Sequence, residues 1–142
     1  MSLLENARVA QLSALLPPSI AFQEAPGDMP TYHQVVEARQ QILNIISGAD
    51  DRLLVVLGPP ADCEPAALTE LATQLQALKP KLEKELCLVV LADAALQPEG
   101  PEAVQINRGL RQARELLLQI NRLGLPTAVS YTHLTLPTIC SV

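Results

Sequence analysis

The chain has 142 residues and a formal net charge of −5, and 49% of its residues are hydrophobic although only 2% are aromatic. Its length suits one domain of ordinary size, whose core must consist of Leu, Val, Ile and Ala because aromatic side chains are so few. The acidic balance, without any window dense in Lys or Arg, argues against a nucleic-acid partner and against an anionic membrane surface. No run reaches the roughly 18 apolar residues of a membrane span, so we expect a cytoplasmic protein.

Three cysteines, Cys63, Cys87 and Cys140, are spread widely along the chain. An odd number at such spacing is neither a disulfide framework nor a C-x-x-C metal motif. We therefore expect reduced thiols that are mostly buried.

Residues 1–30 are predicted to form an N-terminal helical arm. A short amphipathic helix cannot continue through Pro17-Pro18, and a loop with the sequence EAPGDMP follows. Thr31 is then the predicted N-cap of a long helix, because Gln34 three residues later completes a capping box. This helix is expected to end at Gly48, in the left-handed position after the C-cap.

Two uninterrupted apolar runs, Leu53–Leu57 and Leu86–Leu91, predict parallel strands that are covered on both faces. The sequence LPTAV, residues 125–129, predicts the start of a third strand. Helices alternate with these strands, and this order indicates an α/β fold with a parallel sheet. Ligands of such folds bind at the carboxyl ends of the strands.

Leucine spacing predicts a helix over Asp62–Glu85, with a kink or a break at Pro80. Another helix is predicted over Ala103–Arg122, before Gly124. The residues expected to face inward are Leu68, Leu71, Leu75, Leu78 and Leu82 in the first and Ile106, Leu110, Ala113, Leu117 and Ile120 in the second.

The turns after the first two predicted strands contain no cation. No Lys or Arg lies between Arg52 and Lys79, and none lies between Lys84 and Arg108. The acidic residues of these turns are Asp62, Glu64, Asp93, Glu99 and Glu102. A phosphate group placed there would meet like charge, offset only by backbone N–H groups.

Four segments in unbroken order carry a family resemblance. They are ALLPPS, GADDRLLVVLGP, EPAALTELATQLQALKPKLEKELCLVV and QINRGLRQARELLLQINRLGLPTA. Over about residues 11–128 the chain resembles the N-terminal third of 3-deoxy-7-phosphoheptulonate (DAHP) synthase, of the feedback-regulated microbial type. The resemblance implies the first two to three βα units of an incomplete (β/α)8 TIM barrel over residues 31–128. It also implies the first step of the shikimate pathway, in which phosphoenolpyruvate and erythrose 4-phosphate condense at a divalent metal such as Mn or Co.

The chain departs from that family at the positions that carry the chemistry. Pro60 stands where the family has a metal-ligating Cys, and Ala92 stands where it has a phosphate-binding Arg. Gln97, before Pro98, replaces the Lys of a Lys-Pro-Arg motif. We therefore predict no catalytic, cofactor-binding or metal residue in this chain, and we expect the chain itself to be inactive.

Few residues could replace the lost groups. Cys63 and Glu64 could be imagined as a metal pair, but a lone Cys near a helix start is more often a packed thiol. His33, in the first turn of the helix after the arm, is expected to be a polar surface residue. No function is expected for His133, because it lies in residues 129–142, which are predicted to be a non-native tail.

Residues 129–142 are predicted to be a non-native tail. No charged residue follows Arg122, and VSYTHLTLPT departs from the family where a strand should continue. One codon choice for these ten residues, GTC TCT TAT ACA CAT CTG ACG CTG CCG ACG, resembles a transposon-based sequencing adapter read in frame. The alternative is a genuine Thr-rich edge strand.

Three hypotheses about function stay open at this point. The chain is a fragment of an active DAHP synthase with unusual substitutions, or it comes from a degenerate paralogue with a binding or oligomerisation role. The third hypothesis is an unrelated, small acidic α/β interaction module. Homo-oligomers are expected to form through the N-terminal arm, which the family uses to join subunits.

Overall fold

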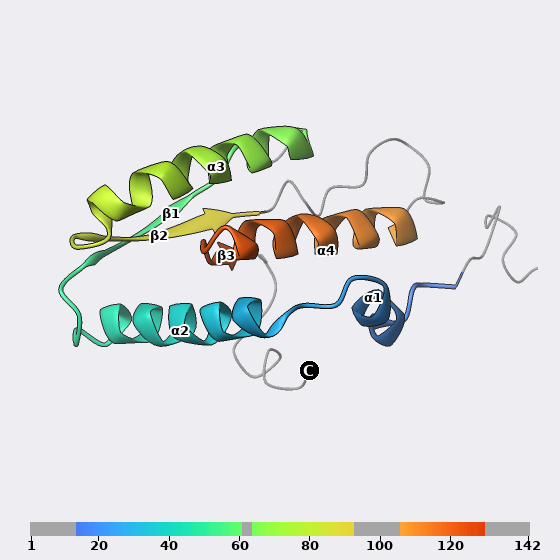
Figure 1. Ribbon diagram of the computed structural model, residues 1–142, viewed down its shortest axis with the longest axis horizontal. Coiled ribbons are helices and arrows are strands. Elements are labelled where there is room, and N and C mark those ends of the chain that lie inside the picture. Colours follow the sequence, from blue (N-terminus) through green and yellow to red (C-terminus); the bar gives the residue numbers. More distant parts are fainter. Residues whose placement is uncertain (1–13, 61–63, 93–105, 130–142) are drawn as a thin grey trace, which may run out of the picture.

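The computed structural model describes residues 14–60, 64–92 and 106–129 (Figure 1). The elements of this part, in chain order, are α1 (Pro18–Glu24), α2 (Met29–Ile46), β1 (Leu53–Leu57), α3 (Pro65–Leu82), β2 (Leu86–Leu91), α4 (Ile106–Arg122) and β3 (Thr127–Ala128). None of the helices in these ranges is long and apolar enough to cross a membrane.

The three strands form one parallel sheet in the order β1-β2-β3. Leu53 lies opposite Leu86 in the register of β1 and β2, and Val90 lies opposite Thr127 in that of β2 and β3. The α/β prediction and the places of all three strands are confirmed. β1 and β2 have the predicted bounds because their apolar, Val- and Leu-rich runs suit a pleated sheet.

The core lies between the sheet and the helices α3 and α4. Alternate residues of β2 face these helices, and the end of that row, Val90 and Ala92, is fully buried. The buried core residues are Leu68, Ala72, Leu75, Leu88, Val90, Ala92, Ala113, Leu116, Ile120 and Leu125. Figure 1 shows α3, α4 and α2 in that order across the molecule, as three roughly parallel helices.

β1 is not covered on both faces, so that part of the strand prediction is wrong. Leu53 is 64% exposed, Val56 is 48% exposed and Leu57 is 38% exposed. β1 lies at an edge of the described sheet, and α3 packs mainly on β2, so an apolar run occurs here without full burial. β2, in the middle of the sheet, is buried at four consecutive residues as predicted.

The amino end of α2 also differs from the prediction, because Asp28 rather than Thr31 is the N-cap. Oδ1 of Asp28 accepts hydrogen bonds from the backbone N of Thr31 at 2.8 Å and from its Oγ1 at 2.6 Å. Thr31 is therefore the third helical residue, and no capping box forms with Gln34. The predicted end is confirmed, since Gly48 has a φ of 77°.

The helices α3 and α4 are close to the predicted ones but differ in detail. α3 continues through Pro80 and ends two residues later, so no break into two helices occurs. Leu78, at 44% exposed, does not face inward. Ile106 and Leu110 are 46% and 39% exposed, because the first turns of α4 extend beyond the tip of β2 (Figure 1). Gly124 ends this segment with a φ of 78°.

The chain before α2 lies along α4 and includes the helix α1, which the sequence analysis missed. Asn107 accepts a hydrogen bond from the backbone N of Leu16 at 2.6 Å and donates one to the carbonyl of Ala14 at 2.8 Å. Arg114 stacks over the ring of Phe22, with 4.0 Å from its Cζ to the ring centroid. The described part of the arm is thus held on its own chain.

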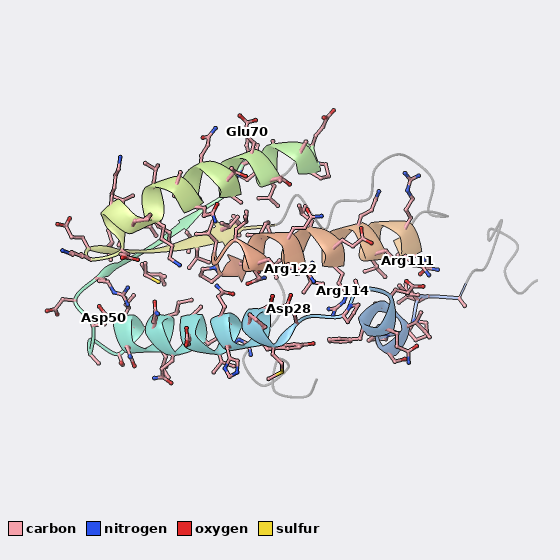
Figure 2. All side chains as sticks on the ribbon, viewed as in Figure 1. Asp28, Asp50, Glu70, Arg111, Arg114 and Arg122 are labelled. Carbon is pink, nitrogen blue, oxygen red and sulfur yellow. The ribbon has the colours of Figure 1, made fainter. Side chains whose placement is uncertain are left out.

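Arginines of α4 extend this contact along the helix. Arg111 pairs with Glu24, and Nε of Arg122 pairs with Oδ2 of Asp28 at 3.1 Å. Figure 2 shows Arg111, Arg114 and Arg122 on the side of α4 that faces this segment. The pKa values of Glu24 and Asp28 are lowered from their ordinary values, chiefly by hydrogen bonds from Arg111 and Thr31 respectively.

Candidate functional site

The carboxyl ends of β1 and β2 are the expected ligand-binding edge, and Gly58 brings them together. A Cβ built on Gly58 would lie 2.6 Å from the carbonyl oxygen of Leu91 and 2.7 Å from its Cβ. No side chain fits in that space. The glycine therefore lets the chain leave β1 in close contact with the last residue of β2.

Among the described residues of the two strand ends, no side chain could hold a metal or a phosphate. Pro60 is exposed and its side chain has no donor atom. The backbone N of Ala92 donates to the carbonyl of Ala128 at 2.8 Å, and its methyl group is fully buried in the core. By strand alternation, Leu91 is the residue that faces away from the helices here, and it is also apolar.

Ala92 lies on the face of the sheet that packs against the helices α3 and α4. A long cationic side chain at this position would enter the packed layer between β2 and the helices. The position that can project from the other face of the sheet is occupied by Leu91. Both residues lack charge, so the described end of β2 has no phosphate-binding cation, whichever of them corresponds to the family's Arg.

The remaining sequence candidates fall into two groups. His33 is exposed on α2, as expected of a surface residue, and Glu64 is exposed before α3, where its side chain makes no capping hydrogen bond. The others lie outside the described residues: Asp62, Cys63, Asp93, Gln97, Pro98, Glu99, Glu102, His133 and Cys140. Within the described ranges, no three His, Cys, Asp or Glu residues gather as a metal site would require.

Charged residues of both signs line a hollow at the amino end of the sheet. The hollow measures about 230 Å³, and its lining includes the cations Arg52 and Lys79, the acids Glu37 and Glu83, and Cys87. Arg52 and Lys79 are the two cations at the ends of a stretch of sequence that contains no Lys or Arg. The fold brings them to the end of the sheet opposite the expected ligand-binding edge.

These cations are already engaged. Nζ of Lys79 donates to the carbonyl of Gly124 at 2.7 Å, and Arg52 pairs with Asp50 at 2.7 Å. Burial raises the pKa of the Cys87 thiol, and the nearby Arg52 offsets this only in part. As predicted, Cys87 is a buried free thiol. Sequence reasoning missed this cluster because its members are far apart in the chain.

No protein-family model matches the chain. It is 36% identical over 145 residues to "Phospho-2-dehydro-3-deoxyheptonate aldolase, Phe-sensitive" of Escherichia coli (strain K12), which covers 94% of this chain and 41% of that protein. It is 33% identical over 140 residues to "Phospho-2-dehydro-3-deoxyheptonate aldolase" of Amycolatopsis methanolica, covering 90% of this chain and 69% of that protein. The chain thus spans less than half the length of the first of these relatives.

A solved structure is similar over most of the chain. It is described as "Structure of Phospho-2-dehydro-3-deoxyheptonate aldolase from Francisella tularensis SCHU S4". The TM-score is 0.75 at 30% sequence identity, over 87% of this chain and 40% of that one.

Proposed function

We propose a function from one premise: this chain belongs to the phospho-2-dehydro-3-deoxyheptonate aldolase family, also called the DAHP synthase family. The chain is proposed to be the N-terminal part of such a protein, with the first two to three βα units of an incomplete (β/α)8 barrel. A barrel of this kind needs about 250 residues. The open edge of β1 and its exposed apolar side chains agree with strands that would continue the sheet.

The chain alone is proposed not to catalyse the condensation of phosphoenolpyruvate with erythrose 4-phosphate. The observation that carries this proposal is the chemistry of the two strand ends, where Pro60, Leu91 and Ala92 supply neither a metal ligand nor a cation. Two phosphorylated substrates require several Arg and Lys side chains to offset their charge. Pro60 does not fit the family's divalent metal at this position, because its side chain has no donor atom and such a site needs thiolate, imidazole or carboxylate groups.

The origin of this inactivity has two explanations. In one, the chain is a piece of an active enzyme that completes its site with other residues. In the other, it comes from a degenerate paralogue that keeps the scaffold and a binding or oligomerisation role. The missing metal ligand and the absence of cations from both strand ends favour the second explanation. The small acidic α/β interaction module stays an alternative hypothesis, and a cytoplasmic location stays a prediction.

Residues 129–142 are proposed to be non-native. Val129 is partly buried against the core, and the residues after it lie outside the described ranges. Amplifying the gene from its source beyond the codon for Ala128 tests this proposal. A natural coding sequence that contains VSYTHLTLPT would contradict it.

A synthase assay tests the proposed lack of activity. The 142-residue chain is mixed with phosphoenolpyruvate, erythrose 4-phosphate and Mn²⁺ or Co²⁺, with the Escherichia coli relative as a positive control. We expect no product above the enzyme-free rate, and no stoichiometric Mn²⁺ binding in electron paramagnetic resonance titrations. Turnover or tight Mn²⁺ binding by the chain would show that other residues replace the lost groups.

The same assay on the protein extended through its natural downstream sequence separates the two explanations. The degenerate paralogue should stay inactive at every metal concentration. Turnover would instead identify a piece of a working enzyme.

A further inference from the structure

Residues 14–25, which we call the strap, lie along α4 without becoming part of the core. Within the described helix α1, which belongs to the strap, no residue is buried. Its apolar side chains stay accessible, with Ile20 at 37% and Phe22 at 51% exposed, and Leu15 before it is 65% exposed. Burial of apolar surface is the main source of stability in a folded domain, so the strap gains little from that source.

Polar side chains of α4 hold the strap instead. They are Asn107 in the first turn of the helix and, further along it, Arg111 and Arg114 (Figure 2). The Nε of Arg114 donates to the carbonyl of Ala25 at 2.9 Å, at the carboxyl end of α1. The ion pair of Arg111 with Glu24 lies in solvent, because both side chains are 43% exposed. An exposed pair contributes little by itself, so the strap is held by several weak contacts.

Helix α1 is too short to persist once it leaves α4. It has seven residues, and isolated helices shorter than about 12 residues are marginal in water. Its N-cap residue, Pro17, makes no side-chain capping hydrogen bond. Folding of α1 is therefore coupled to its contact with α4, and the contacts of the strap should form and break together.

We propose that the strap opens from α4 as one unit while the sheet and the helices α2, α3 and α4 stay folded, and that charge controls this opening. The hinge lies at residues 26–27, because Asp28 is fixed to α2 by two hydrogen bonds from Thr31. Helix α4 contains four arginines and one glutamate. Opening therefore uncovers Arg111 and Arg114, and with them a cationic face, on a chain whose net charge is −5.

Ionic strength should act on the strap and spare the rest of the fold. The distance over which salt screens exposed charges falls from about 10 Å at 0.1 M to about 3 Å at 1 M. The pair of Arg111 and Glu24 is exposed to this screening. The described core between the sheet and the helices α3 and α4 consists of apolar residues, and salt does not weaken their burial.

The first test places a fluorescent reporter on the strap. The chain has no tryptophan, so Phe22→Trp supplies a single one beside Arg114. Between about 0.01 M and about 1 M NaCl, its anisotropy should fall and its emission should move to longer wavelength. The urea midpoint of the chain, followed by circular dichroism, should not fall over the same range. A tryptophan that stays rigid until urea unfolds the whole chain, or that is already mobile at low salt, would overturn the proposal.

Hydrogen exchange of the unsubstituted 142-residue chain repeats the test without a reporter. The backbone N of Ala21 donates to the carbonyl of Pro17, and the backbone N of Ala25 donates to that of Ala21. At high salt these amides should exchange at least threefold faster, while the amides of β2 keep their rates. Unchanged exchange in α1, or equal acceleration in α1 and β2, would show that the strap does not open separately.

A third test assigns the control to one ion pair. In the Phe22→Trp chain, Arg111→Gln should lower the NaCl concentration of half opening at least threefold. Arg108→Gln is the matched control, because Arg108 is exposed on the same helix and none of the described hydrogen bonds or ion pairs joins it to the strap. The reversed pair Glu24→Arg, Arg111→Glu should restore the opening concentration toward that of the parent. Equal shifts for the two single variants, or no restoration by the reversed pair, would overturn the control by charge.

Discussion

The strands β1 and β2 have nearly the same sequence, LLVVL and LCLVVL, and very different surroundings. Val90 in β2 is fully buried, and Leu57, its register partner in β1, is 38% exposed. Leu88 is 6% exposed, whereas Leu53 on the same face of the sheet is 64% exposed. An apolar run therefore indicates a strand, and the position of that strand in the sheet decides how much of it is buried.

Hydrogen bonds at the start of β1 also hold this strand in place. Arg52 donates from its backbone N to Oδ1 of Asp50 at 3.0 Å, and from its guanidinium to the carbonyl of Glu83 at 3.3 Å. The backbone N of Leu53 donates to the carbonyl of Glu85 at 2.8 Å. The start of β1 is thus tied by hydrogen bonds to the turn before β2, whereas β2 is mostly buried.

The largest effect is expected from truncating matched leucines of the two strands. Leu88→Ala removes buried methyl groups and leaves a cavity, so it should lower the free energy of unfolding by about 2–5 kcal/mol. Leu53→Ala removes groups that are already in water and should change it by about 0.5 kcal/mol or less. Urea titrations followed by circular dichroism measure both. Equal losses would mean that β1 is covered in solution, for instance by another copy.

A smaller effect is expected where the two strands meet at their carboxyl ends. Gly58→Ala places a methyl group 2.6 Å from the carbonyl oxygen of Leu91, and moving the strand ends apart should cost about 1–3 kcal/mol. Gly109→Ala is the control, because a Cβ there meets nothing within 4 Å on helix α4. That substitution should stabilise the chain by about 0.5–1 kcal/mol. A neutral Gly58→Ala would show that the two strand ends are not in contact in solution.

Much of the fold could be predicted from the sequence because its signals are local. The apolar runs define β1 and β2, and Gly48 and Gly124 mark the ends of α2 and α4 through their positive φ values. The N-cap of α2 was misplaced because Asp28 and Thr31 are both good capping residues three positions apart. Only the structure shows that the first binds the second.

The candidate site could be predicted only from what its residues lack. The identity of Pro60 excludes a metal ligand at that position without any structure. The direction of a side chain is harder to predict from the sequence. Placing Ala92 in the core and Leu91 on the other face of the sheet requires the strand register.

The smallest effect is a pH dependence that isolates the polar anchor of β1. Asp50 lies at the end of the molecule opposite α1 (Figure 2), and hydrogen bonds from the Arg52 side chain and backbone lower its pKa below the usual value. A carboxylate whose pKa is lower in the folded state stabilises the fold above its unfolded pKa of about 3.9, and this stabilisation is lost as the pH falls through the folded value. Asp50→Asn should therefore lower the urea midpoint at pH 7. The difference between its midpoint and that of the wild type should shrink as the pH approaches 3. Asp51→Asn makes the same charge change one residue later and should follow the wild-type profile. Parallel losses in all three proteins on acidification would mean that Asp50 contributes nothing to holding β1, which would leave its backbone pairing with β2 as the anchor.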